Sequence, residues 1–124
     1  MKEQTITILR IAPGKAPETI SIPNTLEALQ SEVGGTIEAV YPFPEEAAVV
    51  CHDEAKLIGL PLNRALSDED GSIYDIIAGT FLVVGLSKDN LASIPSELLA
   101  KFTKRFARPE SFVRMDGRIA VIRM

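Results

Sequence analysis

The residues best suited to chemistry lie in the middle of the chain, where an asparagine and an arginine interrupt an apolar stretch. Asn63 and Arg64 close that stretch, and Tyr74 and Asp75 open the next one. An arginine can fork onto a carboxylate or a phosphate, and an asparagine amide both donates and accepts hydrogen bonds. Polar groups in apolar surroundings need such partners. The four residues either contact a ligand or form a structural clamp. In the clamp, which we favour, Arg64 pairs with Asp75 and Asn63 bonds the backbone of an irregular loop.

Cys51, His52 and Asp53 supply the residue types of a nucleophilic site, but their spacing argues against one. Neighbours on a strand point to opposite faces, so the thiol and the imidazole cannot act as a nucleophile and its base. We expect a buried structural cysteine beside a surface histidine. The acidic stretch 68–71 lacks the remaining oxygen ligands of a calcium loop. One cysteine and one histidine are too few for a zinc site within one chain. The sequence therefore predicts neither a metal nor a cofactor.

A second candidate site is a basic stripe near the C-terminus. Four cations fall on one side of the expected last helix: Lys101, Lys104, Arg105 and Arg108. Their spacing suits a phosphate backbone and predicts weak contact with nucleic acid. Residues 101–124 carry a net charge of +5, whereas the first hundred carry −9. A basic tail docked on an acidic body is therefore the simpler interpretation, and the helix dipole favours cations near a helix C-terminus in any case.

Composition predicts a single folded domain. The chain has 124 residues, of which 46% are hydrophobic and 24% are charged, values that are ordinary for a globular protein with its own core. No apolar run approaches the ~20 residues that a membrane-spanning helix needs, and the first residues lack a signal-peptide pattern. One cysteine excludes an internal disulfide. These features favour a cytoplasmic protein that does not enter a membrane.

Hydrophobic periodicity divides the chain into strands and two helices. Strands are expected where side chains alternate, or where a short apolar run lies between turn residues, at 5–11, 18–22, 36–41, 47–52 and 80–85. A short helix is expected to begin after an N-cap at Asn24 and to end before Gly34. A longer helix is expected over 91–107, because the residue before Pro109 avoids helical angles.

The remaining segments give weaker signals. Glycine and proline interrupt both periods over 54–64, which we interpret as an irregular excursion, and 74–77 is expected to form one helical turn. Asp116 and Gly117 predict a tight C-terminal hairpin. The element order of hairpin, helix and strands is that of a β-grasp-like domain. We therefore expect an α+β fold with a mixed β-sheet in β-grasp-like order, extended by a C-terminal helix and β-hairpin.

Three blocks of sequence resemble the domain-of-unknown-function 3846 family, in the same order along the chain: GGTIE (34–38), GLPLNR (59–64) and DIIAG (75–79). The resemblance covers roughly residues 5–87, which would form the family-like core of a single domain, 1–124, with 88–124 as its C-terminal extension. HDEAK (52–56) stands where relatives tend to have an Asn- and Glu-rich turn with glycine. The resemblance implies a small protein of bacterial phages, plasmids or conjugative elements. It implies no catalytic residue.

These observations favour a non-enzymatic accessory or interaction protein that acts by protein contact or by sequestering a partner. The mobile-element setting is compatible with a role in modulating host defence. The apolar edge of the C-terminal hairpin would also suit pairing across a homodimer. The alternative is a nucleic-acid-associated protein that uses the basic C-terminal helix. An enzyme or small-ligand binder centred on Asn63, Arg64 and Asp75 ranks third.

Overall fold

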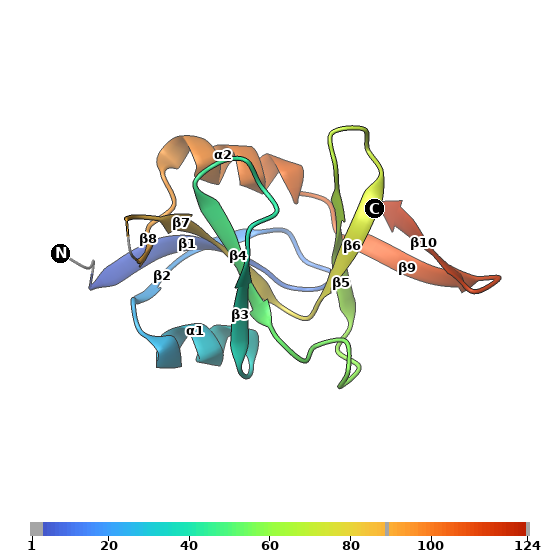
Figure 1. The fold of residues 1–124 in the computed structure, drawn as a ribbon, viewed down its shortest axis with the longest axis horizontal. Coiled ribbons are helices and arrows are strands. Elements are labelled where there is room, and N and C mark those ends of the chain that lie inside the picture. The colour runs from blue at the N-terminus through green and yellow to red at the C-terminus, as the bar shows by residue number, and fades with distance from the viewer. Residues whose placement is uncertain (1–3, 89, 124) are drawn as a thin grey trace.

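The computed structural model describes residues 4–88 and 90–123, which form an α+β fold (Figure 1). The helices are α1 (Leu26–Val33) and α2 (Ser96–Arg105). The strands are β1 (Thr5–Ile11), β2 (Glu18–Pro23), β3 (Ile37–Val40), β4 (Ala47–His52), β5 (Leu62–Ser67), β6 (Ile73–Ala78), β7 (Phe81–Leu86), β8 (Leu91–Ala92), β9 (Glu110–Met115) and β10 (Arg118–Arg123). Among the described helices, none is long and apolar enough to cross a bilayer.

Six strands form the main sheet, in which β2, β1, β7, β4 and β3 follow one another and β8 also pairs with β7. Each of these pairings is antiparallel. The mixed sheet that we expected is therefore wrong for the described strands. Strand β3, which follows α1, lies at the edge of the sheet, and β4 lies between β3 and β7. Strand β7 is antiparallel to both β1 and β4. The β-grasp-like order stays a prediction that these pairings do not confirm.

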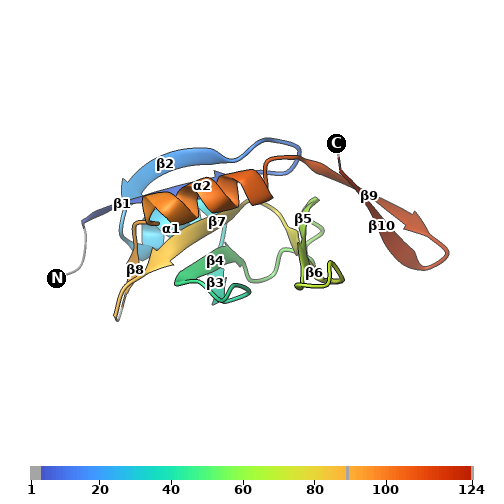
Figure 2. The same cartoon turned by 90° about the horizontal axis from the view of Figure 1, so that it is seen from above.

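One helix covers each face of the main sheet (Figures 1 and 2). Successive side chains of a strand go to opposite faces, so β4 and β7 are buried on both sides and have nearly continuous apolar sequences. Leu29 and Val33 of α1 belong to the core on one face. Phe102 and Phe106 belong to the core on the other face, where the ring of Phe102 packs at a tilt against that of Phe43, with centroids 4.3 Å apart.

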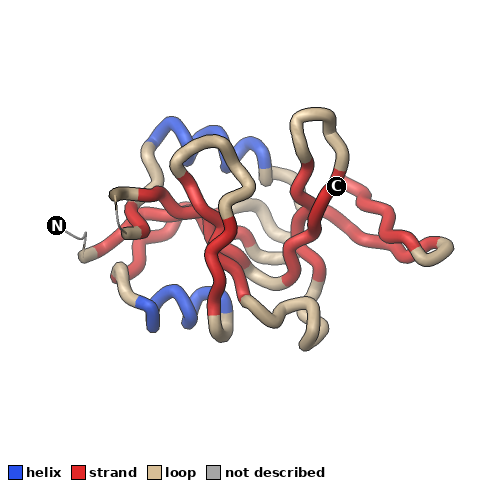
Figure 3. The backbone as a smooth tube through the Cα atoms, in the orientation of Figure 1, coloured by secondary structure: helices blue, strands red, loops and turns tan. Residues whose placement is uncertain are grey.

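Strands β5 and β6 form a separate hairpin at one end of the main sheet (Figure 3). Leu66 and Ile77 bring it into the same core cluster as Phe102, so the hairpin packs on the α2 side. The expected irregular excursion thus ends at Leu62, where β5 begins, and the helical turn expected over 74–77 is wrong because these residues lie in β6. Two shifts of register within the hairpin interrupt the alternation that would have revealed the strands.

Both helices begin later than the sequence predicted. The N-cap of α1 is Thr25, whose hydroxyl accepts from the Ala28 N–H at 3.1 Å. Asn24, the predicted cap, is buried and donates instead to the carbonyl oxygen of Leu91 at 3.1 Å. Helix α2 begins at Ser96, because the preceding residues form β8 against β7.

The last two strands form a hairpin that projects from the molecule (Figures 1 and 2). We call it the C-terminal arm, residues 110–123. The predicted tight turn is confirmed, since Asp116 and Gly117 have φ angles of 51° and 77°, the left-handed values that a two-residue hairpin turn requires. The base of the arm contacts β5, and its two strands form a sheet of their own.

Candidate functional site

Asn63 lies on β5 with its side chain fully buried. Its Nδ2 group donates to the carbonyl oxygen of Ile11 at 2.9 Å and to that of Gly79 at 2.8 Å. Ile11 ends β1, and Gly79 lies in the turn between β6 and β7. Both amide hydrogens therefore tie β5 to backbone at the end of the main sheet.

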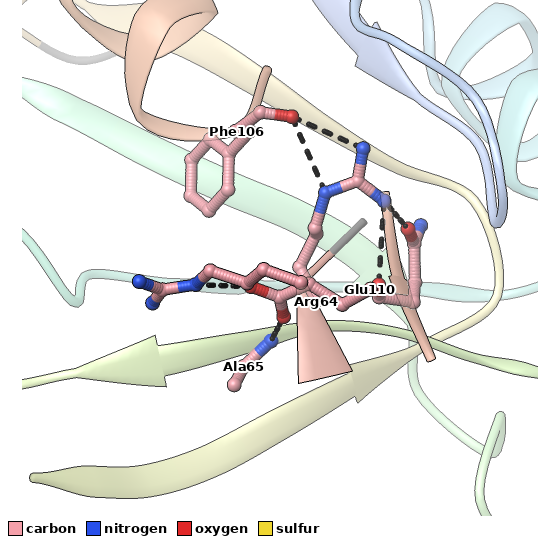
Figure 4. Close-up of polar contacts among 6 residues, drawn as sticks. Arg64, Ala65, Phe106 and Glu110 are labelled. Carbon is pink, nitrogen blue, oxygen red and sulfur yellow. Dashed lines mark hydrogen bonds and ion pairs between the residues drawn. The ribbon is translucent and has the colours of Figure 1, made fainter. Parts of the chain in front are cut away.

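Arg64 follows on the same strand and is 1% exposed. Its Nη1 donates to the Oδ1 and carbonyl oxygens of Asn63, at 2.8 and 3.3 Å (Figure 4). Its Nη2 donates to the carbonyl oxygen of Lys15 at 2.6 Å and to that of Phe106 at 3.0 Å, and Nε reaches the same Phe106 oxygen at 3.3 Å. A guanidinium has five N–H groups, and these hydrogen bonds occupy all of them. The side chain thus joins β5 to the β1–β2 turn and to the end of α2.

The surroundings of Arg64 contain groups that favour its charge, but its burial opposes the charge. Phe106 follows the last turn of α2, and the C-terminus of a helix attracts a cation through the helix dipole. Burial lowers the pKa of Arg64, and the negative charge of Glu110 opposes that shift. Arginine keeps its proton through such a shift, so the interior of the folded protein holds a permanent positive charge.

Tyr74 and Asp75 lie apart from this pair, in the exposed first half of β6. Tyr74 is 53% exposed, and Asp75 forms an ion pair with Lys56 at 2.6 Å. The predicted pairing of Arg64 with Asp75 is therefore wrong. The register of the hairpin places Ile77 opposite Arg64, and the arginine side chain turns inward to α2. Asn63 likewise bonds strand ends and a turn of the main sheet in place of the irregular loop that we expected.

Glu110 is the member of this cluster that the sequence did not reveal. Its side chain is 6% exposed. One carboxylate oxygen accepts from the Ala65 N–H at 2.7 Å, and the other accepts from Arg123 Nε at 3.0 Å (Figure 4). The sequence signal was the opposite charge of Glu110 and Arg123, which open and close the C-terminal hairpin and pair directly across it. Glu110 anchors the arm to β5.

The predicted basic stripe divides into two parts. Lys101 forms an ion pair with Glu45, and this contact lowers the pKa of the Glu45 carboxyl. The guanidinium of Arg105 lies over the ring of Phe43, 5.0 Å from its centroid. These two cations dock on the body of the protein, as the simpler interpretation of the stripe predicted. Lys104 and Arg108 are exposed.

Cys51 and His52 occupy opposite faces of β4. The Cys51 thiol lines a small cavity of about 140 Å³; burial and the neighbouring charge of Glu38 raise its pKa to about 11. His52 accepts from the Glu54 N–H at 3.0 Å, through Nδ1, and its ring packs against Gly35. The described residues hold no group of three or more His, Cys, Asp or Glu side chains placed to bind a metal ion.

A larger hollow of about 580 Å³ lies between the β5–β6 hairpin and the C-terminal arm. We call it the hairpin groove. The hairpin side contributes mainly apolar side chains, and the arm contributes Arg114 and Ile119. Its lining includes the exposed residues Ile73 and Tyr74. The groove therefore brings a predicted site residue, Tyr74, beside the C-terminal arm.

The fold and the cluster define a class: an α+β domain whose antiparallel sheet lies between two helices and whose side hairpin is held by a buried Asn–Arg pair. The chain belongs to the family described as Domain of unknown function (DUF3846), whose model matches residues 6–107. The match includes Asn63, Arg64 and all of α2, and it ends before the C-terminal arm. Searches of curated proteins and of solved structures found no match for the chain.

Proposed function

We propose that this protein is a non-enzymatic accessory protein that acts by contacting another protein chain. The observation that carries the proposal is the C-terminal arm, which holds out large apolar side chains beyond the part of the chain that matches the family. Four of them are more than a third exposed: Val113, Met115, Ile119 and Ile122. Apolar surface gathered on a projecting segment marks an interaction site. The arm and the adjoining hairpin groove are the proposed contact surface.

Two features of the interior support a non-enzymatic role. The five N–H groups of Arg64 and both amide hydrogens of Asn63 are used inside the protein, so binding a substrate there would require breaking the clamp. The raised pKa of Cys51 keeps its sulfur in the thiol form at neutral pH, and the thiol is a poorer nucleophile than the thiolate.

The proposed setting is the cytoplasm of a bacterium that carries a mobile genetic element, and the resemblance of the sequence to its family supports the mobile-element part of this proposal. A protein that binds a host factor there would act by occupying or sequestering it. This setting requires no chemistry at Asn63 and Arg64.

Affinity capture tests the protein-contact proposal. Tagged wild-type protein and the double variant Met115→Asp, Ile122→Asp would be used in parallel on lysate of the native host. Both substitutions place a charge on exposed positions of the arm and leave the core cluster untouched. We expect the wild type to retain at least one protein that the variant loses. The same set of proteins on both baits would contradict the use of the arm.

Nucleic-acid binding is a second candidate, supported by four exposed cations in the last turn of α2 and in the segment that follows it. They are Lys104, Arg108, Arg114 and Arg118. Lys101 and Arg105 are engaged elsewhere in the molecule, so the arm replaces half of the predicted stripe. A mobility-shift assay at low ionic strength tests this candidate, since each phosphate contact adds a slope of about −0.9 to the salt dependence. Absence of salt-sensitive binding to DNA and RNA would exclude it.

A further inference from the structure

The C-terminal arm exposes apolar side chains on both of its faces. Neighbours on a strand alternate between faces, and the register pairs Ile119 with Arg114 on one face and Ala120 with Val113 on the other. Met115 and Ile122 share the face of Val113 and are 59% and 52% exposed. An isolated two-stranded hairpin is marginally stable in water. The outer part of the arm therefore needs a cover that the protomer does not itself provide.

The hairpin groove offers the apolar surface that would cover the arm of another molecule. It is bounded by the arm on one side and by Ile73 and Tyr74 on the other, and these two side chains are about half exposed. An apolar ribbon laid in the groove would cover both walls at once. Because the arm forms one wall, a ribbon from another molecule in the groove would lie beside the arm of the first.

We propose that the occupant of the hairpin groove is the C-terminal arm of a second copy of this chain. The two arms lie side by side and run in opposite directions about a two-fold axis, and each enters the groove of the other molecule. This arrangement is isologous, since the same surface is used on both copies and both grooves are filled in one closed dimer. It rests on the proposed function, because it names the chain that the arm contacts.

Charge complementarity favours a second copy over an unrelated partner. The outer half of the arm carries Arg114 and Arg118, both exposed, on either side of one acidic residue, Asp116, in the turn. The turn between β5 and β6 carries Asp68, Glu69 and Asp70, also exposed. This acidic turn adjoins the groove, since Tyr74 lines both the groove and the neighbouring hollow that Asp68 and Glu69 line. An arm that enters from a second molecule would bring its arginines to this turn.

The acidic turn has two cations of its own molecule beside it, since Lys101 and Arg105 line the same hollow, but the arginines of the arm do not line it. Within a protomer the arm projects away from the β5–β6 hairpin (Figure 2), so the tip of the arm points away from the acidic turn. In a dimer with opposed arms, the tip of each arm lies over the base of the other arm. The β5–β6 hairpin of the second molecule is at that base, so the tip of each arm approaches the acidic turn of the other molecule. Part of the charge asymmetry of the sequence, +5 beyond residue 100 and −9 before it, is used within one molecule by the pair of Lys101 and Glu45, and Arg114 and Arg118 add an interaction between copies.

A charge-exchange experiment tests the proposal with the full chain. The arm variant is Arg114→Glu, Arg118→Glu, and the turn variant is Glu69→Lys, Asp70→Lys. Asp68 is left intact because its Oδ1 accepts from the N–H groups of Asp70 and Ser72 at 3.0 Å. The control is Lys104→Glu, Arg108→Glu, which makes the same change of charge outside the arm. Circular dichroism would establish that each variant is folded.

Light scattering coupled to size exclusion should give the wild type twice the 13.5 kDa mass of the chain. Each charge-reversed variant alone should dimerise at least about tenfold more weakly, since like charges then face each other. An equimolar mixture of the two should restore the dimer, because both contacts of the mixed pair join opposite charges. The control should dimerise as the wild type does.

Three results would overturn the proposal: a monomeric wild type at ~100 µM, far above the micromolar dissociation constants of modest complexes; dimerisation that both variants leave unchanged; or a mixture that fails to associate. A monomeric wild type whose arm still retains a host protein in the capture experiment would refute self-association and leave the proposed function standing. A dimer with no arm-dependent host partner would support self-association, and it would mean that the protein chain contacted by the arm is a second copy of this chain.

Discussion

Arg64 places a charge in the interior, and its contacts explain why an arginine is needed there. Its hydrogen bonds go to three carbonyl groups and one amide oxygen from separate parts of the chain. A planar fork with fixed donors meets such a set with little loss of conformational freedom, whereas a lysine ammonium has three donors at a single point. The residue therefore links the end of α2, the β1–β2 turn and β5 at one position.

Arg64→Lys should destabilise the protein by about 3 kcal/mol, because it keeps the buried charge and leaves carbonyl oxygens of Lys15 or Phe106 without a donor. Urea unfolding followed by circular dichroism measures the loss. The matched control is Arg118→Lys, an exposed position where we expect a change within about 0.5 kcal/mol. Equal unfolding midpoints for the two variants would contradict the clamp. A stable Arg64→Lys protein that lost its partner would point to recognition.

Cys51 should make stability depend on pH in the alkaline range. Its pKa rises from 9.0 to about 11 on folding, so between these values the unfolded chain loses the thiol proton while the native protein keeps it. The native state then binds more protons, and the free energy of unfolding falls as the pH rises from about 9 to about 11. Relative to Cys51→Ala, the wild type should lose on the order of 2 kcal/mol over this range. Parallel pH profiles for the two proteins would show that the thiol is not held in its neutral form.

At the scale of elements, the contacts of Glu110 hold the C-terminal arm in position on β5. Its carboxylate satisfies the Ala65 N–H of β5 and holds Arg123 at the other end of the hairpin. Phe112 and Val121 above it are half-buried. Beyond these residues the arm rests on its own cross-strand pairs, so its orientation depends on the anchor at its base.

Glu110→Ala should therefore loosen the arm without unfolding the core. It leaves the Ala65 N–H without its acceptor, a loss of about 1–2 kcal/mol, and frees Arg123. Hydrogen exchange should accelerate at the amides of β9 and β10 and stay unchanged in β1, β4 and β7. Glu97→Ala, at an exposed position in α2, serves as the control. Unchanged exchange in the arm would show that the anchor lies elsewhere.

The sequence predicted those elements whose own residues determine them. Strand β1 alternates and is β-branched, and Asp116-Gly117 specifies its turn without help from the rest of the chain. The hairpin β5–β6 was missed because its register shifts break the two-residue period, and because Leu66 and Ile77 are buried by Phe102, which lies far along the sequence. The start of α2 was misplaced for a similar reason. Gly85 lets the backbone at Ser93 approach β7 so closely that a Cβ atom would overlap the Ser93 carbonyl, and this contact draws the preceding residues into β8.

Two residues of the candidate site, Asn63 and Arg64, were predicted from the sequence, whereas their hydrogen-bond partners were not. The isolation of Asn63 and Arg64 within apolar sequence correctly indicated buried groups with hydrogen-bond partners. Most of those partners are backbone carbonyls 16 to 52 positions away, and a backbone carbonyl leaves no mark in a sequence. Asp75 was named as the partner because it opens the next apolar stretch, and it forms an ion pair with Lys56 instead.

The whole molecule combines a well-packed body with an arm whose apolar side chains are exposed. Both helices and the β5–β6 hairpin contribute to cores on the two faces of one sheet, so the body should unfold in one cooperative transition. The arm lies outside both cores and outside the region that matches the family. Burial of its apolar side chains and pairing of its charges would stabilise the arm, and both require another surface. In the proposed dimer each molecule supplies that surface to the other.

Association of this kind should make thermal stability depend on protein concentration. A native dimer that unfolds to monomers gains stability by mass action, so the melting temperature of the wild type should rise by several degrees between ~1 and ~100 µM, given that about 1 kcal/mol shifts the midpoint of a domain of this size by roughly 4 °C. Added salt should reduce the rise, because the contacts between the arm and the acidic turn are screened. The arm variant Arg114→Glu, Arg118→Glu should show a smaller rise over the same concentrations, because it dimerises more weakly, whereas Lys104→Glu, Arg108→Glu should follow the wild type. A melting temperature of the wild type that does not change with concentration would mean that the arm folds and persists without a second copy.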